Sequence, residues 1–255
     1  MTDKLDRLWM TKTKNDEWWS SFVTSPLAIA ANYCVVDLPW LSPNRITLAS
    51  FLTAIVSVIC IVVGGTVNFI AAALLIHLSH VLDCMDGQMA RYRQVSSPVG
   101  SYYDRVTDQI QVTLWFGAVG YAAYAQSMSA VPLFLAFIGV AFYGLRGYVK
   151  YVAIEIETSL DPDYSAKMTE ALRVPITAGL RFPMRANALW FLKEQPKALI
   201  FDEGTFIFML SVALVLDTLT PMLWVFAVSQ FVLASYFSIQ NGREIAGTRK
   251  SPIRK

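Results

Sequence analysis

The sequence predicts an all-α integral membrane protein with six transmembrane helices and an N-terminal interfacial amphipathic helix. Hydrophobic residues make up 55% of the 255 positions and charged residues only 16%, whereas a typical soluble domain carries about 25% charged residues. The apolar residues also occur in long blocks, and a helix needs about 20 such residues to cross a bilayer. This composition excludes a soluble globular domain and a disordered chain.

Six apolar segments of the chain predict six membrane spans. Three short turns without Lys or Arg join them in pairs, and all 21 basic residues lie in the other segments. Because basic residues favour the cytoplasmic side of a membrane, we expect both termini and the two longer loops in the cytoplasm, with the protein in the cell (inner) membrane. The predicted spans are residues 46–64, 67–84, 106–127, 131–154, 205–217 with some extension, and 221–241.

The residues before the first span predict an amphipathic helix at the cytoplasmic interface. Residues 15–41 carry several aromatic side chains, including Trp18 and Trp40, and such side chains favour the headgroup level of a membrane. A seventh, partial span is disfavoured because Asp37 and Pro39 interrupt the segment. The polar stretch that begins the chain lacks the apolar core of a signal peptide, so we expect no cleaved segment.

These patterns divide the chain into three parts. Residues 1–42 form a cytoplasmic N-terminus with the interfacial helix, 43–241 form a six-helix domain, and 242–255 form a basic cytoplasmic tail. Within the domain, the polar residues 158–204 predict a cytoplasmic loop with one or two short helices. The net charge of +2 gives no reason to expect nucleic acid as a partner.

Four carboxylates cluster at the cytoplasmic boundary of the second and third spans. Asp83 and Asp86 are three positions apart and share one helix face, while Asp104 and Asp108 are four apart and share another. The connection 87–103 contains Gly and Pro, which can turn the chain so that the two helix ends face each other. An ionisable residue in a span is costly and therefore indicates function. We expect the four carboxylates to converge on one pocket.

Converging carboxylates repel each other unless a cation lies among them. Arg91, Arg93 and Arg105 are too few and too widely spaced to neutralise four acids. A divalent cation or a pair of them is the better candidate, and all-oxygen ligation favours Mg²⁺, Mn²⁺ or Ca²⁺ over Zn²⁺. Because Mg²⁺ often takes substrate phosphate oxygens as its remaining ligands, the cluster points to phosphate chemistry. A structural polar network or an ion pathway is the alternative interpretation.

Eight fixed residues over 26 positions resemble the signature of the CDP-alcohol phosphotransferase family, also called the CDP-alcohol phosphatidyltransferase family. They read Asp83-x-x-Asp86-Gly87-x-x-Ala90-Arg91, then eight residues, then Gly100-x-x-x-Asp104-x-x-x-Asp108. The segment Pro43-Asn44-Arg45-Ile46-Thr47, at the start of the first span, resembles the Pro-Asn-x-x-Thr of many members. The resemblance implies that residues 43–241 form the family's membrane domain and that the protein is a homodimer.

The resemblance also implies a role for each motif residue. The four aspartates would bind two Mg²⁺ or Mn²⁺ ions, which hold the diphosphate of a CDP-linked donor. Asp108 would in addition be the general base that takes a proton from the acceptor hydroxyl. The implied donor-binding residues are Gly87, Ala90, Arg91, Gly100, Asn44 and Thr47.

The reaction implied is transfer of a phosphatidyl group from CDP-diacylglycerol to the hydroxyl of a small polar alcohol, with release of CMP. The alternative is transfer of a phospho-alcohol from CDP-ethanolamine, CDP-choline or another CDP-alcohol to a lipid or polyol hydroxyl. The motif is shared by both reactions and does not separate them. A divalent-cation transporter or a non-catalytic membrane scaffold is a remote alternative, and a transporter should show broken helices on both sides of the midplane.

Charged residues outside the motif bear on the identity of the acceptor. Arg105, Arg146 and Lys150 could bind an anionic acceptor such as an inositol or glycerol phosphate, or could simply anchor the helix ends on the positive side. Asp202 and Glu203 could recognise a cationic acceptor such as ethanolamine, or could be solvated loop charges. The two clusters favour opposite acceptors, so the sequence leaves the acceptor open.

Two further pairs have both a structural and a functional interpretation. His77 and His80 lie one turn before the first aspartate and could be interhelical hydrogen-bonding residues or metal ligands. Asn44 and Thr47 could contact the donor or could belong to the start of the first span, since Asn is also a common helix cap.

Overall fold

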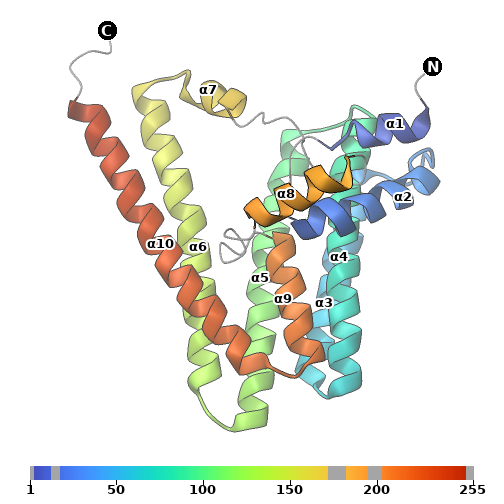
Figure 1. Ribbon diagram of the computed structural model, residues 1–255, viewed down its shortest axis with the longest axis vertical. Coiled ribbons are helices and arrows are strands. Elements are labelled where there is room, and N and C mark those ends of the chain that lie inside the picture. The colour runs from blue at the N-terminus through green and yellow to red at the C-terminus, as the bar shows by residue number, and fades with distance from the viewer. Residues whose placement is uncertain (1–2, 13–17, 172–181, 195–202, 251–255) are drawn as a thin grey trace.

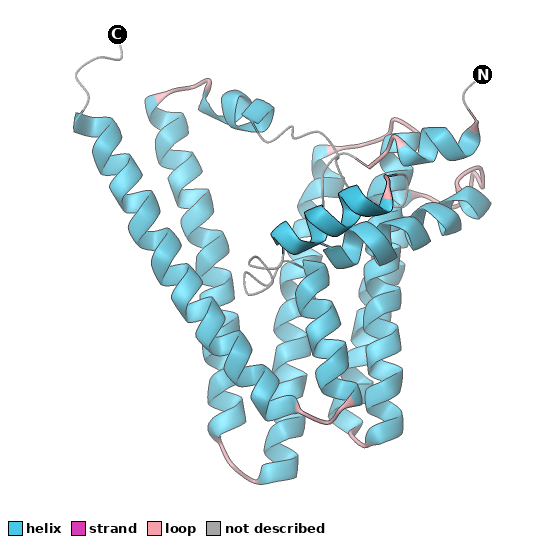
Figure 2. Ribbon diagram, viewed as in Figure 1, coloured by secondary structure: helices cyan, strands magenta, loops and turns pink. Residues whose placement is uncertain are grey.

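The computed structural model describes residues 3–12, 18–171, 182–194 and 203–250, and these residues are helical without any strand (Figure 2). The helical elements are α1 (Lys4–Trp9), the π-helical segment η1 (Ser20–Thr24), α2 (Ser25–Val35), α3 (Pro43–Val63), α4 (Thr66–Tyr92), α5 (Pro98–Ser127), α6 (Val131–Leu160), α7 (Tyr164–Ala171), α8 (Met184–Glu194), α9 (Glu203–Val215) and α10 (Leu219–Lys250). Each of the six predicted spans falls on one of these helices, and the all-helical fold class is confirmed.

The long helices form a bundle of three hairpins whose turns lie at one end (Figure 1). The turns connect α3 to α4, α5 to α6 and α9 to α10. At the first turn, Gly64 and Gly65 have positive φ angles of 76° and 84°, which glycine adopts without steric cost. The helices α1, α2, α7 and α8 lie at the opposite end, together with the C-terminal end of α10 (Figure 1).

Four of the described helices are long and apolar enough to cross a membrane: α3, α4, α6 and residues 219–247 of α10. The chain is therefore a multi-pass membrane protein. Helix α9 is apolar but has 13 residues, and α5 has 30 residues but contains many polar side chains at its N-terminal end. The spans predicted on α5 and α9 thus stay predictions.

Serine side chains cap the N-terminal ends of α3 and α5. Ser42 Oγ accepts a hydrogen bond from the backbone N–H of Arg45 at 3.3 Å, and Pro43 follows as the first helical residue of α3. Ser97 Oγ accepts from the backbone N–H of Gly100 at 3.0 Å at the start of α5. Such caps satisfy amide groups that have no partner within the helix, so both helices begin at residues fixed by the sequence.

An aromatic core lies between α5, α6 and α10. The rings of Phe116 on α5 and Phe226 on α10 stack with centroids 3.5 Å apart, and Gly139 on α6 lies against the second ring. A Cβ atom added at Gly139 would lie 2.4 Å from Phe226 Cδ1. Small residues let helices approach closely in a membrane, and here the glycine makes room for the ring.

The segment before α3 packs on the C-terminal half of α4. Leu8 of α1 and Ile29 of α2 are buried together with Met85 and Met89 of α4 in a second core, separate from the aromatic one. Of residues 15–41, for which the sequence predicts an amphipathic helix, residues 18–35 are helical and include α2, and residues 13–17 lie outside the described residues. The location of this segment at a membrane interface stays a prediction.

Candidate active site

Three of the four motif aspartates lie together between α4 and α5. Asp83, Asp104 and Asp108 each offer one carboxylate oxygen, and these oxygens all lie within 4.8 Å of one another. The side chains are half-buried, so their negative charges are only partly screened by water. A group of three hard oxygen ligands from carboxylates fits a divalent cation such as Mg²⁺ or Mn²⁺.

Asp86, the fourth predicted ligand, faces the start of α3. Its Oδ2 atom accepts a hydrogen bond from Thr47 Oγ1, and its side chain is buried with 6% exposure. Thr47 Oγ1 also lies 3.2 Å from the backbone carbonyl oxygen of Pro43. Asp86 is thus separate from the group of three, although it borders the same pocket as Asp104.

A small pocket of about 450 Å³ opens beside Asp86 and Asp104, between the starts of α3 and α5 and the end of α4. All six residues predicted to bind the donor line it: Asn44, Thr47, Gly87, Ala90, Arg91 and Gly100. The structure thus brings together residues from two segments that are about 40 positions apart in the sequence.

Two glycines of the motif leave room at the walls of the small pocket. A Cβ atom at Gly87 would lie 3.2 Å from Arg91 Nη1, and one at Gly100 would lie 3.3 Å from Ser97 Oγ. Both distances are shorter than ordinary van der Waals contact, so a larger residue at either position would displace its neighbour.

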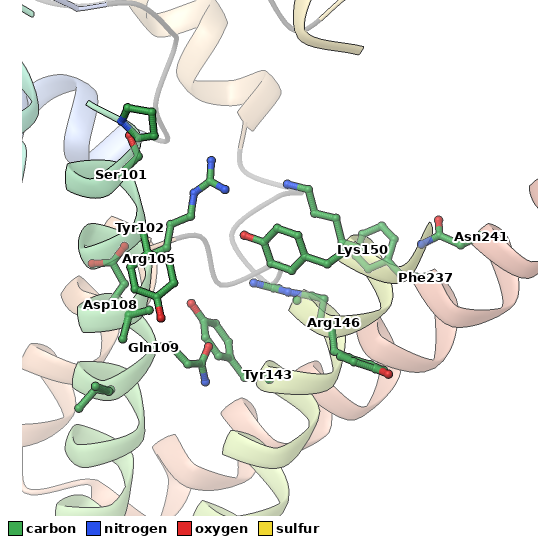
Figure 3. Close-up of a pocket in the computed structure, with 17 residues that line it drawn as sticks. Ser101, Tyr102, Arg105, Asp108, Gln109, Tyr143, Arg146, Lys150, Phe237 and Asn241 are labelled. Atoms are coloured by element: carbon green, nitrogen blue, oxygen red, sulfur yellow. The ribbon is translucent and has the colours of Figure 1, made fainter. Parts of the chain in front are cut away.

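A large pocket of about 1290 Å³ lies on the other side of the aspartates, between α5, α6 and α10. It contains Asp108 and Arg105 of α5 together with Arg146 and Lys150 of α6, the residues predicted to contact the acceptor. Figure 3 shows Arg105 facing the two basic residues of α6 across the pocket. The Arg146 guanidinium lies 5.2 Å from the ring centre of Tyr143, which also lines the pocket.

The metal-binding candidates connect the two pockets. Asp104 lines the small pocket and Asp108 lines the large one, and both belong to the group of three with Asp83. Ser101, one turn before Asp104 and Arg105, lines both pockets. Two substrates, one in each pocket, would therefore meet at these carboxylates.

The histidines before the motif contact the N-terminal segment. The ring of His77 lies 5.2 Å from that of Trp19, and His80 Nε2 is 3.0 Å from Ser20 Oγ. Among the described residues neither histidine belongs to the group that could hold a metal, which favours the hydrogen-bonding interpretation for His80. Asp202 lies outside the described residues, and Glu203 begins α9.

The sequence gives no sign of one contact at the small pocket. Arg91 Nε donates a hydrogen bond to the backbone carbonyl oxygen of Thr11 at 2.6 Å. The two residues are 80 positions apart, and a backbone carbonyl carries no sequence signal.

Comparison with known proteins matches this chain to one protein family. The family model for CDP-alcohol phosphatidyltransferase matches residues 40–202. Cholinephosphotransferase 1 of Xenopus laevis is 27% identical over 144 residues, which are 52% of this chain and 35% of that protein. The inner membrane protein YnjF of Escherichia coli is 27% identical over 135 residues, 52% of this chain and 62% of that protein.

A third relative is archaeal. The bifunctional IPC transferase and DIPP synthase of Thermococcus kodakarensis is 29% identical over 98 residues, 38% of this chain and 22% of that protein. In each of these three cases the match spans less than two thirds of the relative's length. Because the family model spans more than half of this chain, including the whole aspartate motif, the chain belongs to the CDP-alcohol phosphatidyltransferase family, whose members are transferases of phosphate-containing groups.

Proposed function

We propose that this chain is a metal-dependent CDP-alcohol phosphotransferase of phospholipid biosynthesis. It transfers a phosphatidyl group from CDP-diacylglycerol to the hydroxyl of a small polar alcohol and releases CMP. The observation that carries the proposal is that Asp104 lines the small pocket and Asp108 the large one, while both belong to one group with Asp83. A transferase of this kind has to hold a donor and an acceptor on opposite sides of one phosphorus atom.

The small pocket is the proposed donor site. Arg91 binds donor phosphate oxygens, and the small residues Gly87, Ala90 and Gly100 leave room for the cytidine. Arginine suits this role because its planar fork of N–H groups matches the oxygens of a phosphate. Members of the family are generally dependent on divalent metals, and Asp83, Asp86, Asp104 and Asp108 are the proposed ligands of two Mg²⁺ or Mn²⁺ ions.

The chemical step requires one proton transfer and one displacement at phosphorus. Asp108 accepts the proton of the acceptor hydroxyl, and the resulting oxygen attacks the phosphorus that is bonded to CMP. A new P–O bond to the acceptor forms as the P–O bond to CMP breaks, and CMP leaves with the electron pair. When bound, the metal ions neutralise charge on the phosphate and leaving-group oxygens.

The large pocket is the proposed acceptor site. Arg105, Arg146 and Lys150 give it three cations, which favour an acceptor that itself carries a phosphate. An anionic polar alcohol of this kind pairs with CDP-diacylglycerol as the donor. The cation arrangement is therefore the reason to prefer phosphatidyl transfer.

The reverse assignment of the lipid is the second candidate function. One relative is named as a cholinephosphotransferase, which favours a CDP-alcohol such as CDP-choline or CDP-ethanolamine as donor and a lipid or polyol hydroxyl as acceptor. In that case the volume of the large pocket would serve an acyl-bearing acceptor.

The proposed setting is a membrane with both termini and the active site on the cytoplasmic side. The basic residues lie outside the three short hairpin turns of the bundle, and the positive-inside rule favours the cytoplasmic side for the segments that carry them. We place the protein in the cell (inner) membrane, with residues 43–241 as the six-helix catalytic domain between the N-terminus 1–42 and the tail 242–255. Homodimerisation is part of the proposal through the family resemblance.

A product analysis with defined substrates tests the proposal. The purified protein is incubated with CDP-diacylglycerol, CDP-ethanolamine or CDP-choline, each with a panel of acceptors, and CMP and the product lipid are identified by mass spectrometry. Phosphatidyl transfer predicts CMP and a phosphatidyl product from CDP-diacylglycerol with a phosphorylated alcohol. Product only from a CDP-alcohol and a lipid would establish the second candidate. No CMP from any combination in Mg²⁺ or Mn²⁺ would favour a transporter or scaffold.

A further inference from the structure

The N-terminal segment, defined here as residues 3–12 and 18–35, packs against α4, the helix that bears Asp83 and Asp86. Leu8 of α1 is fully buried in the core that also contains Met85 and Met89 of α4. The family match begins at residue 40, so these contacts come from a part of the chain that the family domain does not include. Helix α4 thus packs against residues that precede the family domain.

Buried amide side chains connect α2 to the motif. Asn32 Nδ2 donates hydrogen bonds to the backbone carbonyl oxygen of Met85 at 2.9 Å and to Gln88 Oε1 at 3.2 Å. Gln88 Nε2 in turn lies 3.3 Å from the backbone carbonyl oxygen of Ser25. Asn32 is 0% exposed and Gln88 is 3% exposed. Because buried hydrogen bonds are costly to leave unmade, they fix α2 against the turn of α4 that bears the aspartates.

The same segment also contacts Arg91, which lines the small pocket. Arg91 Nε donates to the carbonyl oxygen of Thr11 at 2.6 Å. On the other side of the guanidinium, Nη1 and Nη2 lie 3.2 and 3.4 Å from the position of a Cβ atom at Gly87, and both residues line the small pocket. Since the guanidinium is planar and rigid, a bond that fixes Nε also sets the direction of both Nη atoms.

The position of Thr11 is set by α1. Thr11 Oγ1 donates to the backbone carbonyl oxygen of Leu8 at 2.6 Å, and Thr11 itself is buried. Lys4 Nζ donates to the backbone carbonyl oxygen of Tyr33 at 2.6 Å, which joins α1 to α2. Displacement of α1 would therefore move the Thr11 carbonyl away from Arg91.

We propose that the N-terminal segment is a working part of the donor site, in which the Thr11 carbonyl orients Arg91 for the donor diphosphate. Thr11 is a positioning residue, because it acts through Arg91 and does not itself contact the substrate. This inference rests on the proposed function, which assigns the small pocket to a CDP-linked donor. It adds a specific consequence: donor affinity depends on residues that precede the family domain.

A matched pair of variants in α1 and the following residues tests the proposal. Leu8→Asn removes the buried anchor, whereas Met10→Asn makes the same chemical change at a side chain that is 63% exposed. We expect Leu8→Asn to raise the donor KM about tenfold, the scale of a lost hydrogen bond to a charged group. The acceptor KM should stay within about twofold of wild type, and Met10→Asn should change neither.

A double-mutant cycle separates positioning from general destabilisation. Arg91→Lys keeps the positive charge but removes the Nε donor and the planar fork. If α1 acts through Arg91, Leu8→Asn should raise the donor KM by less than about twofold in the Arg91→Lys background, because coupled residues are not additive. Effects that multiply in the double variant would overturn the inference. The milder Leu8→Ala replaces Leu8→Asn if the latter does not yield folded protein, as judged by its Tm.

Direct binding of CDP in Mg²⁺, measured by isothermal titration calorimetry, provides a readout besides activity. Weaker CDP binding by Leu8→Asn but not by Met10→Asn supports the inference. A Leu8→Asn protein with lower Tm or kcat but unchanged donor KM and CDP affinity would overturn it and leave the proposed function intact. A wild-type protein that neither binds CDP nor releases CMP would instead refute the proposed function, and the inference with it.

Discussion

Asp104 and Asp108 lie one turn apart on α5, and they border different pockets. Asp104 lines the small pocket and Asp108 the large one, while both carboxylates belong to one group with Asp83. One turn of helix thus separates the proposed donor side from the proposed acceptor side. This arrangement assigns different consequences to the loss of each carboxylate.

Replacement of Asp108 should abolish turnover and spare donor binding. Asp108→Asn removes the base on the acceptor side, and general base catalysis contributes about 10²–10⁴ in rate. We expect kcat for CMP release to fall by at least about 10². At a saturating Mg²⁺ concentration, which offsets the loss of one metal-binding oxygen, CDP affinity should stay within a few-fold of wild type. Glu155→Gln is the control, because Glu155 is exposed and lines neither pocket. Unimpaired turnover by Asp108→Asn would remove this residue from the base role.

Replacement of Asp83 or Asp104 should weaken the binding of metal and donor together. Asp83→Asn and Asp104→Asn each remove one of the three charged oxygens that lie within 4.8 Å of one another. We expect a higher Mg²⁺ or Mn²⁺ concentration for half-maximal CMP release and a lower donor affinity at fixed metal. Metal and CDP titrations of each variant measure the two effects. Metal-dependent donor affinity equal to wild type would count against these ligands.

The hydrogen bond between Thr47 and Asp86 should affect the donor more than the acceptor. Thr47→Val removes the hydroxyl that donates to Asp86 at the wall of the small pocket. We expect the donor KM to rise about fivefold or more, since hydrogen bonds to charged groups are worth about 1.5–3 kcal/mol. Thr53→Val is the matched control on α3, because Thr53 Oγ1 donates only to the backbone of Ala49 among the described contacts. Equal effects of the two variants would contradict this role.

The basic residues of the large pocket should determine acceptor affinity. Arg146→Met and Lys150→Met remove cations of α6 that line the pocket. For a phosphorylated acceptor we expect the acceptor KM to rise about tenfold or more, as charge-assisted hydrogen bonds are lost, with the donor KM unchanged. Lys167→Met is the control, since Lys167 pairs with Asp161 at 2.7 Å outside the pocket. An unchanged acceptor KM would assign the two cations to membrane anchoring.

The contact between Gly139 and Phe226 should make α6 sensitive to a single methyl group. A Cβ atom at position 139 would lie 2.4 Å from Phe226 Cδ1, so Gly139→Ala has to displace the stacked ring. Overpacking of a core costs about 1–3 kcal/mol, and a lower Tm should follow. Gly117→Ala is the control, because a Cβ atom there has no neighbour within 4 Å. A Tm equal for both variants would contradict the tight packing.

The sequence predicts the helices well because membrane spans depend on long apolar blocks. The helices extend beyond the predicted spans 67–84 and 106–127: α4 continues to Tyr92 and α5 begins at Pro98. Hydropathy marks only the apolar part of a helix, whereas these two continue through the polar motif. Helix α5 begins at Pro98, directly after the capping residue Ser97, and both residues favour a helix start.

The motif spacing predicts which residues meet, but it does not predict their pairing. The connection between α4 and α5 turns the chain so that Asp83 and Asp104 meet, yet Asp86 turns to Thr47, 39 positions earlier in the chain. The contact of Thr11 with Arg91 could not be predicted, because it uses a backbone carbonyl 80 residues away. Such contacts depend on how the N-terminal segment packs across α4, which periodicity within one helix does not specify.

The metal dependence of CMP release tests the central claim most directly. The purified protein is stripped with EDTA and supplied with donor and acceptor, and CMP is measured as Mg²⁺ or Mn²⁺ is added to wild type and to Asp104→Asn. We predict no CMP before metal addition, saturable release by wild type, and a shift of the metal titration to higher concentration in Asp104→Asn. CMP release that is independent of divalent cations, or titrations that coincide for the two proteins, would contradict a metal centre at Asp83, Asp104 and Asp108.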